Sequence, residues 1–317
     1  MEYRRLGKSG LKVSEIALGS WLTYGTVTEK EQAIACVKQA YDLGINHFDC
    51  ANVYGARPHA AEEVMQEALK PYARDSYVIT TKAFWPVGDG PNDRGLSRKH
   101  IVSQVEQSLK SLGVDYVDIF YFHRYDAETD LEESLRALDD LISQGKVLYG
   151  GLSEWSADRI AAGVHLQKEL GLHKFAASQP VYNMLERYIE PAIIPICEEA
   201  GIGQVVFSPL AQGVLTGKYR KGSAAPEGSR AATPGVNRFL EGSLTEEVLD
   251  KVEQLSAIAT KAELSLPQLA LAWILRQPNV ASALIGASRP EQVVENAKAA
   301  GVKLNDDILD DIEAVLA

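Results

Sequence analysis

The sequence predicts an α/β fold, a closed (β/α)8 TIM barrel that occupies residues 1–317 as a single domain. Eight short apolar runs of β type alternate with longer segments of helical period, a pattern typical of parallel sheets. A chain of 317 residues is somewhat longer than eight such units usually need. An open doubly wound sheet is the alternative, but no Gly-x-Gly-x-x-Gly fingerprint follows the first run. The nearest similar segment, Gly201-Ile202-Gly203, precedes a strand instead of following one.

Each expected element is supported by its own periodicity and by the turn residues that flank it. Strands are expected at residues 16–19, 46–49, 77–82, 116–122, 147–152, 175–178, 204–207 and 281–285. Helices are expected at residues 29–43, 59–72, 98–112, 130–144, 156–170 and 190–200. A β-hairpin is expected over 3–15, and 304–317 predicts an extra C-terminal helix outside the barrel. Two connections, 83–97 and 209–243, are long enough to indicate functional or mobile loops.

Composition narrows the classes of function. The formal net charge of −11 and the pI near 5.1 argue against a nucleic acid or an anionic membrane surface as the main partner. No apolar stretch has the length of a signal peptide or a membrane-spanning helix, so we expect a cytoplasmic protein. The three cysteines form an odd set without CxxC spacing, which predicts reduced thiols and neither a disulfide framework nor a metal site.

Four ionisable side chains stand where the second, third and fourth strands end. Asp49 ends the second strand and Tyr54 lies in the loop after it. Lys82 ends the third strand, and the fourth runs into His123. Because catalytic groups of a TIM barrel come from the C-terminal ends of different strands, we expect these four side chains to meet at one rim.

Together the four residues form a plausible proton-donating unit. A free tyrosine, with a pKa of about 10, holds its proton too tightly to be an efficient acid at neutral pH. A buried ammonium such as that of Lys82 is expected to lower the pKa of Tyr54, and Asp49 would keep the lysine charged. His123 can then hydrogen-bond a substrate oxygen and stabilise the charge that develops on it.

Each of these residues also has a simpler interpretation when taken alone. Asp49 could cap a helix, and Tyr54 could be a packing residue. Lys82 could be a surface charge, and His123 could be a hydrogen-bonded core histidine. Their joint appearance at three successive strand ends favours the functional interpretation.

Several longer motifs resemble the aldo-keto reductases over nearly the whole chain. The segments that carry the resemblance are 49–55, 80–82, the aromatic run ending at His123, 179–183 and 208–210. Two further motifs, 213–219 and 288–296, are similar to the bacterial and potassium-channel β-subunit branch of that family. The resemblance implies a (β/α)8 barrel that binds an extended nicotinamide dinucleotide. It also implies a catalytic tetrad made of Asp49, Tyr54, Lys82 and His123.

The resemblance implies a set of cofactor contacts as well. Ser153 and Gln179 would hold the nicotinamide carboxamide, Phe207 would stack on the nicotinamide, and residues 208–210 would line the pyrophosphate. The implied cofactor-binding residues are Trp21, Asp49, Ser153, Gln179, Phe207, Ser208, Pro209, Leu210, Gln212, Gly213, Lys218, Arg230, Gly286, Ser288, Arg289, Gln292, Glu295 and Asn296. Two positions depart from the family pattern. Glu154 stands where many relatives have asparagine, and Phe207 replaces a tyrosine or tryptophan but keeps the stacking face.

NADPH is the expected cofactor, with NADH as the weaker alternative. The 2′-phosphate of NADPH needs fixed cationic donors, and Arg289 is the best candidate for this contact. It precedes an expected helix start, where backbone amides also favour an anion. Lys218 and Arg230 resemble basic residues that fold over the cofactor, although a solvated loop charge is the simpler interpretation of Arg230.

The substrate is expected to be a small carbonyl compound held by loops at the same rim. Candidates for the pocket wall are Trp21, Tyr24, Phe84, Trp85, Arg124 and Tyr125. The expected substrate contacts are Trp21, Tyr54, Trp85, His123 and Arg124. Trp155 and Trp273 are expected to be packing residues instead, because they lie on helix-type sequence.

The reaction implied by the resemblance is the reduction of aldehydes or ketones to alcohols. Hydride would come from nicotinamide C4 and the proton from Tyr54. The alternative is a redox-sensing auxiliary subunit similar to potassium-channel β-subunits, with slow catalysis, although all four tetrad residues are retained. A barrel isomerase or aldolase that uses no nicotinamide is a third hypothesis. The sequence is also compatible with an oligomer.

Overall fold

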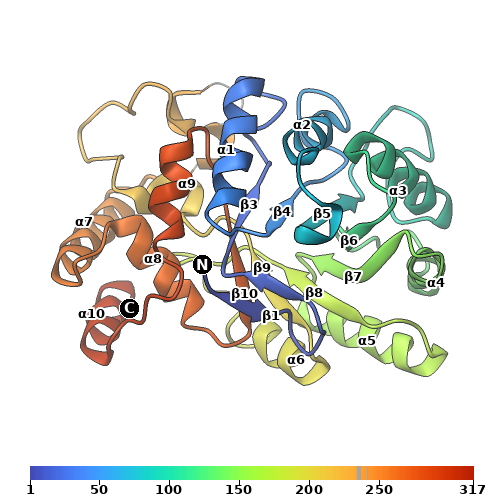
Figure 1. Cartoon of the computed structure of the whole chain (residues 1–317). Coiled ribbons are helices and arrows are strands. Elements are labelled where there is room, and N and C mark those ends of the chain that lie inside the picture. Colours follow the sequence, from blue (N-terminus) through green and yellow to red (C-terminus); the bar gives the residue numbers. More distant parts are fainter. Residues whose placement is uncertain (234–236, 241) are drawn as a thin grey trace.

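Eight parallel strands close into a barrel in the order β10, β3, β4, β5, β6, β7, β8, β9 (Figure 1). This computed structural model describes residues 1–233, 237–240 and 242–317. The strands are β3 (Ile16–Gly19), β4 (His47–Asp49), β5 (Val78–Ala83), β6 (Val117–Phe122), β7 (Val147–Ser153), β8 (Phe175–Gln179), β9 (Gly203–Val206) and β10 (Val280–Ile285). Most strand residues are buried on both faces, which is why these segments are continuous apolar runs in the sequence.

Helices cover the outside of the barrel between successive strands (Figure 1). They are α1 (Lys30–Asp42), α2 (Ala60–Leu69), α3 (Arg98–Leu112), α4 (Leu131–Ser143), α5 (Ala157–Leu170), α6 (Ile193–Ala200), α7 (Glu246–Lys261), α8 (Leu266–Leu275), α9 (Pro290–Ala297) and α10 (Asp306–Leu316). Short 3₁₀ segments are η1 (Arg74–Ser76), η2 (Ala211–Thr216), η3 (Arg230–Ala232) and η4 (Asn237–Leu240). Local signals fix the ends: Ser97 accepts from His100 N at the start of α3, and Gly113 ends it in the left-handed conformation.

The predicted fold class is confirmed, and every strand boundary lies within one residue of its prediction. Two helices, α7 and α8, had not been assigned from the sequence, and of α9 only the start after Arg289 was expected. In α8 every residue but Pro267 is buried, so the helix has no polar face and no amphipathic stripe to reveal it. The predicted C-terminal helix is α10, which pairs with α7 through Lys261 Nζ and Asp311 Oδ2, 2.7 Å apart.

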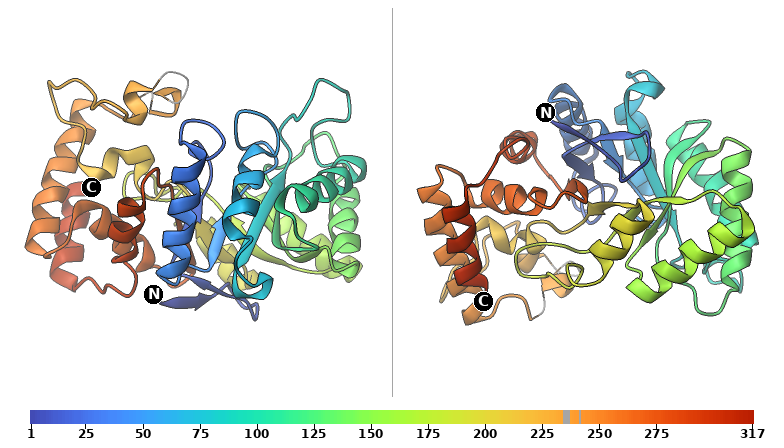
Figure 2. Two further views of the ribbon diagram at one scale, coloured as in Figure 1. Left: turned by 45° about the horizontal axis from the view of Figure 1, so that its top comes forward. Right: turned by 90° about the horizontal axis from the view of Figure 1, so that it is seen from below.

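The N-terminal hairpin closes the end of the barrel opposite to the strand C-termini (Figure 2). Strand β1 (Tyr3–Arg5) pairs antiparallel with β2 (Lys12–Ser14), as predicted. Leu6 and Val13 are fully buried in one cluster with side chains from the barrel interior. Contact is close, since a Cβ on Gly203 would lie 2.4 Å from the backbone nitrogen of Gly7. The barrel floor is therefore sealed by backbone packing as well as by apolar side chains.

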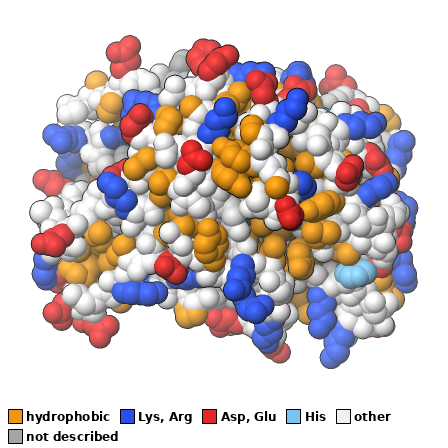
Figure 3. Space-filling view, viewed as in Figure 1, with side chains coloured by type: hydrophobic (Ala, Val, Ile, Leu, Met, Phe, Trp, Pro, Cys, Tyr) orange, Lys and Arg blue, Asp and Glu red, His pale blue; other side chains and the backbone are white. Residues whose placement is uncertain are grey.

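The surface carries charges of both signs, and the cysteines are unpaired. Acidic and basic side chains are interspersed over the face seen in Figure 3. Within the described residues, no helix combines the length and the apolar character required to cross a bilayer. Cys36, Cys50 and Cys197 are free and buried. In the same part of the chain, no group of His, Cys, Asp and Glu is arranged to hold a metal ion.

Candidate active site

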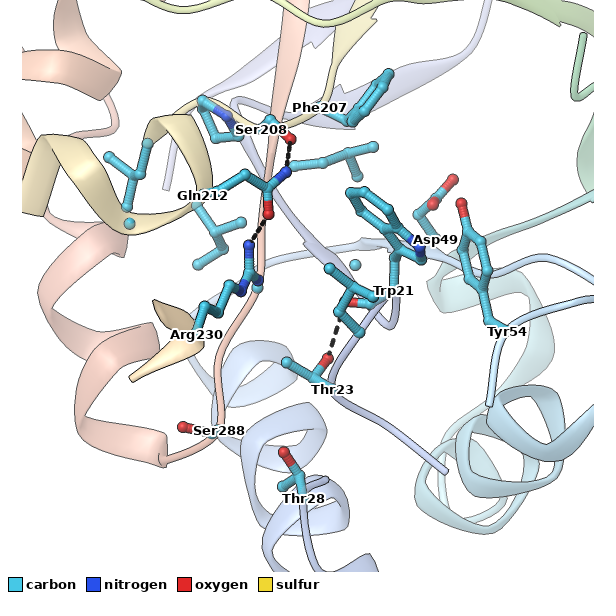
Figure 4. A pocket seen from close by; sticks show the side chains of 18 of the residues that line it. Trp21, Thr23, Thr28, Asp49, Tyr54, Phe207, Ser208, Gln212, Arg230 and Ser288 are labelled. Atoms are coloured by element: carbon cyan, nitrogen blue, oxygen red, sulfur yellow. Dashed lines mark hydrogen bonds between the residues drawn. The ribbon is translucent and has the colours of Figure 1, made fainter. Parts of the chain in front are cut away.

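A cavity of about 1000 Å³ lies at the C-terminal ends of the barrel strands. Asp49, Tyr54 and His123 line one part of it, as predicted, and Lys82 is fully buried beside Asp49. In Figure 4 the cavity extends from Tyr54 and Asp49 past Trp21 toward Arg230. A large concave site that combines apolar walls with convergent polar groups is typical of a ligand-binding site.

The carboxylate of Asp49 organises the buried side of the site. Lys82 Nζ donates to Asp49 Oδ2 at 2.5 Å and to the carbonyl of Cys50 at 2.7 Å. Asp49 Oδ1 accepts from Thr80 Oγ1 at 2.6 Å and from Gln179 Nε2 at 2.9 Å. Burial lowers the pKa of Lys82, and the Asp49 carboxylate opposes this shift. One carboxylate thus joins β4, β5 and β8.

Tyr54 lies directly over this ion pair. Lys82 Nζ is 4.9 Å from the centroid of the Tyr54 ring, and the Tyr54 hydroxyl is 3.5 Å from His123 Nε2. Burial raises the pKa of Tyr54 well above 10, and the negative charge of Asp49 acts in the same direction. The expected lowering of this pKa by Lys82 is therefore not found, because desolvation of the phenolate outweighs it. Tyr54 keeps its proton at neutral pH.

Backbone and side-chain contacts that were not predicted hold the Tyr54 loop in place. Asn52 donates its backbone N–H to the carbonyl of Lys82 at 3.3 Å and accepts one from His59 at 2.6 Å. The fully buried Glu62, on the first turn of α2, binds His59 Nδ1 at 2.6 Å and Thr81 Oγ1 at 2.5 Å. A buried carboxylate cannot be recognised from sequence periodicity, since Glu62 stands in an acidic pair with Glu63 that suggests a solvated helix start.

His123 lies opposite Tyr54 at the end of the cavity where Asp49, Tyr54, Lys82 and His123 meet, which we call the reacting end. Its side chain is 7% exposed, and burial with the nearby charges of Lys82 and Arg124 holds its pKa well below 6.5. The imidazole is therefore neutral at physiological pH. Its Nε2 faces the Tyr54 hydroxyl, whereas its Nδ1 has no hydrogen-bond partner in the described part of the chain. The simpler interpretation, a fully hydrogen-bonded core histidine, does not fit this arrangement.

The far part of the cavity is built by the segment after β9. The rings of Trp21 and Phe207 meet edge to face with centroids 6.0 Å apart, and both line the cavity. Beyond them Ser208, Ala211 and Gln212 all have positive φ, a strained backbone that occurs mainly at functional sites. Gln212 connects the Ser208 hydroxyl to the Arg230 guanidinium (Figure 4).

Arg230 places a cation deep at this end. Burial lowers the pKa of its guanidinium, and the neutral Gln212 is its hydrogen-bond partner. Within residues 1–233, 237–240 and 242–317 no carboxylate pairs with it. Because a desolvated cation is stabilised by a negative charge, this end of the cavity suits an anionic group. The donor set therefore fits the phosphates of a dinucleotide.

Most residues implied as cofactor contacts are brought together at the cavity wall. These are Trp21, Asp49, Ser153, Gln179, Phe207, Ser208, Pro209, Leu210, Gln212, Gly213, Lys218, Arg230, Gly286, Ser288, Gln292, Glu295 and Asn296. Ser153 Oγ donates to the carbonyl of Gln179 at 2.8 Å. Arg289 is the exception: it is exposed at the start of α9 and does not line the cavity.

Only some of the residues predicted for the substrate wall line the cavity. Trp21, Trp85 and Arg124 line the cavity. Tyr24, Phe84 and Tyr125 pack against the core instead, and Trp155 and Trp273 are buried as predicted. Trp155, however, precedes α5 instead of lying on a helix.

Wall residues that sequence reasoning missed are mostly small side chains in the loop after β3 and in the long connection after β9. They include Thr23, Thr26, Val27, Thr28, Thr216, Thr233 and Glu291. Such residues carry no sequence signal of their own, apart from their position after a strand.

Glu154, which departs from the family pattern, supports the structure of a neighbouring loop. Its Oε1 accepts from the backbone N–H of Val181 at 2.7 Å and from the Tyr188 hydroxyl at 2.8 Å. Glu154 itself has a positive φ and does not line the cavity. The departure from asparagine at this position therefore supports the loop after β8.

The geometry can be compared with known proteins at this point. The model of the aldo/keto reductase family matches residues 15–317, which is nearly the whole chain. The chain belongs to the aldo/keto reductase family. Members of the aldo/keto reductase family generally use nicotinamide cofactors and act on small carbonyl compounds.

Relatives of this aldo/keto reductase carry two kinds of name. A protein of Oryza sativa named a probable voltage-gated potassium channel subunit beta is 43% identical over all of this chain and 97% of its own length. A protein of Schizosaccharomyces pombe named a putative voltage-gated potassium channel subunit beta is 45% identical over 99% of this chain and 93% of its own. L-glyceraldehyde 3-phosphate reductase of Escherichia coli is 41% identical over 94% of this chain and 87% of its own length.

Proposed function

We propose that this aldo/keto reductase reduces an aldehyde or ketone to an alcohol with NADPH. The observation that carries the proposal is the pair formed by the Tyr54 hydroxyl and His123 Nε2. These atoms are 3.5 Å apart at the wall of one cavity, above the buried ion pair of Lys82 and Asp49. Two donors that converge on a point where negative charge develops are the arrangement that carbonyl reduction needs.

The residues around the cavity are suited to a nicotinamide dinucleotide. Gln179 uses its amide nitrogen on Asp49, which leaves its carbonyl oxygen as an acceptor for a carboxamide. Phe207 offers an aromatic face, and Arg230 offers a cation at the far end. When bound, the nicotinamide would supply hydride to the carbonyl carbon.

The chain's own residues would handle the proton. Tyr54 donates its hydroxyl proton to the carbonyl oxygen, and neutral His123, with hydrogen on Nε2, donates a hydrogen bond to the same oxygen. The phenolate left on Tyr54 lies beside the ammonium of Lys82, which stabilises the new negative charge. Asp49 holds that ammonium in position through the 2.5 Å contact. A proton from water then restores the phenol.

Replacement of Tyr54 by Phe tests this role. We expect Tyr54→Phe to slow NADPH-dependent reduction of a reactive aldehyde by about 10²–10⁴-fold, the usual contribution of a positioned general acid. Tyr24→Phe is a matched control, since the Tyr24 side chain is fully buried and does not line the cavity. Unchanged turnover in Tyr54→Phe would refute the mechanism.

A preference for NADPH over NADH is part of the proposal. Lys218 and Arg230 both line the cavity, whereas the predicted Arg289 contact is not at its wall. Comparison of the two cofactors with one aldehyde measures the preference. Equal kcat/KM for NADPH and NADH would leave the reductase function intact and refute NADPH selection.

A second candidate function is favoured by the names of the plant and yeast relatives. An auxiliary role, in which the protein binds a membrane channel and senses cofactor redox state, predicts slow turnover with tight NADPH binding. Recovery of a channel on the immobilised protein from membranes of the producing organism, together with slow turnover, would favour this role. Fast multiple turnover without such recovery would favour the reductase.

A further inference from the structure

A second cation stands at the reacting end of the cavity. Arg124 directly follows His123, and its Nη1 donates to the carbonyl of His123 at 2.6 Å. Its guanidinium carbon lies 5.4 Å from the centroid of the Trp85 ring. Arg124 and Trp85 both line the cavity. The arginine is thus held by a backbone carbonyl and an aromatic ring.

Among the residues that the structure describes, no carboxylate forms an ion pair with this arginine. The chain as a whole is acidic, with 43 Asp and Glu against 32 Lys and Arg. Two other partly buried arginines do have acidic partners: Arg74 pairs with Asp118, and Arg187 pairs with Glu190. Asp49, which lines the same cavity, is already paired with Lys82. Arg124 is therefore a cation at the cavity wall that forms no ion pair within the described residues.

Ring contacts connect Arg124 to the proton donor. The ring centroids of Tyr54 and His123 are 5.7 Å apart, and those of His123 and Trp85 are 6.3 Å apart. Trp85 is 39% exposed, so part of its surface is open to a ligand. A carbonyl oxygen bound between Tyr54 and His123 would leave the rest of a short substrate over Trp85, with its far end near Arg124.

We propose that Arg124 binds an anionic group, a phosphate or a carboxylate, on the carbonyl substrate. The planar guanidinium offers paired N–H donors that match either group, and Nη1 alone is engaged by His123 in the described contacts. This inference rests on the proposed reductase function and adds the class of its substrate. The preferred substrates are small aldehydes or ketones that carry a negative charge at the end remote from the carbonyl.

The charge of Arg124 is felt by the reacting groups. It contributes to lowering the pKa of His123 and opposes the rise in the pKa of Tyr54. An anionic group of the substrate bound at Arg124 would compensate the positive charge of the arginine. This group would not contact the substrate's own carbonyl group. Arg124 is thus a substrate-binding residue, distinct in role from the proton donor.

Matched pairs of substrates separate this role from a structural one. Succinic semialdehyde is compared with butanal, and glyceraldehyde 3-phosphate with glyceraldehyde, so that a carboxylate and a phosphate are tested separately. Variants are Arg124→Met, which removes the charge, and Arg124→Lys, which keeps it. Arg159→Met is the control, because Arg159 also stacks on an aromatic ring, 4.3 Å from the Tyr125 centroid, but does not line the cavity.

We expect Arg124→Met to lower kcat/KM for the anionic member of a pair about 10- to 100-fold more than for its neutral member, mainly through KM. Arg124→Lys should keep part of the preference, and Arg159→Met all of it. The KM of the wild type for anionic aldehydes should rise with salt, because the contact is electrostatic.

The outcomes distinguish the inference from the function on which it rests. If the wild type and Arg124→Met show the same ratio of anionic to neutral kcat/KM, Arg124 has only a structural role and the inference is wrong. A preference for one anion alone would identify phosphate or carboxylate as the natural group. If the wild type reduces neither member of either pair with NADPH or NADH, the reductase function itself fails, and the inference fails with it.

Discussion

At the scale of single residues, the Lys82 ammonium is kept charged in a place that disfavours charge. Its side chain is fully buried, and burial lowers its pKa. The Asp49 carboxylate and the Cys50 carbonyl are its hydrogen-bond partners. A buried pair of this kind contributes little net stability relative to apolar residues, but breaking it is costly because one charge remains alone.

Replacement of Lys82 by Met should therefore affect both stability and turnover. We expect Lys82→Met to lower the free energy of unfolding by about 3–5 kcal/mol, since Asp49 is left as an unpaired buried carboxylate. Turnover should fall by about 10²–10⁴-fold through loss of phenolate stabilisation. Urea denaturation and steady-state reduction of an aldehyde measure the two effects.

The double variant Asp49→Asn/Lys82→Met separates the two effects. It removes both charges, so stability should recover in part while turnover stays low. If the double variant were as unstable as Lys82→Met, the unpaired carboxylate would not be the cause of the instability.

At the scale of elements, the segment after β9 brings a cation into the cavity through irregular backbone. Positive φ at Ser208, Ala211 and Gln212 turns the chain sharply, and Gln212 then bonds the Arg230 guanidinium. We expect Arg230→Met to raise KM for NADPH about 10- to 100-fold, with a much smaller change in kcat at saturation, because a charge-assisted contact to phosphate is lost. Fluorescence titration with NADPH provides an independent measure.

Lys221→Met is the control for this prediction. Lys221 belongs to the same long connection, but it pairs with Asp250 of α7 and does not line the cavity. NADPH affinity unchanged in both variants would mean that Arg230 is only a loop charge.

The order of elements could be predicted because each strand and most helices carry a local signal. The eight apolar runs fixed the strands to within one residue, and helix 98–112 was predicted with both ends correct, since Ser97 and Gly113 flank it. Helix α8 lacked a signal because its burial is nearly complete. An apolar period appears only where one side of a helix meets water.

The candidate site was predictable where chemistry depends on residue type and strand position. Asp49, Tyr54, Lys82 and His123 meet as expected. The pKa of Tyr54 was not predictable, because it depends on how completely the ring is buried. The position of Arg289 was not predictable either: it is exposed at the N-cap of α9 and does not line the cavity, although its motif is present.

At the scale of the whole molecule, buried histidines link stability to pH. His47 is fully buried, two residues before Asp49 on the same strand, and burial lowers its pKa to about 4. In the unfolded chain this pKa returns to about 6.5. Below that pH the unfolded state binds a proton that the folded state excludes, so stability falls as pH falls from about 6.5 toward 4. Lowered pKa values of His100 and His123 act in the same direction.

Replacement of His47 should make the protein less sensitive to acid. We expect His47→Leu to remove up to about 3 kcal/mol of the decrease in unfolding free energy between neutral pH and pH 4. Denaturation by urea at a series of pH values between 4 and 8, followed by circular dichroism, measures the slope. An unchanged slope in this pH range would show that His47 is not the group responsible.

The hairpin formed by β1 and β2 limits the routes by which ligands can enter and leave the cavity. Because Leu6 and Val13 stop the barrel at its floor, a molecule that reaches Tyr54 enters and leaves through the loops at the other rim. Cofactor, substrate and product must therefore use the same opening of the cavity, which is lined in part by Trp85 and by the segment that carries Arg230. Release of product through this opening can limit turnover even when proton transfer is fast. Loop substitutions far from the tetrad can therefore change turnover.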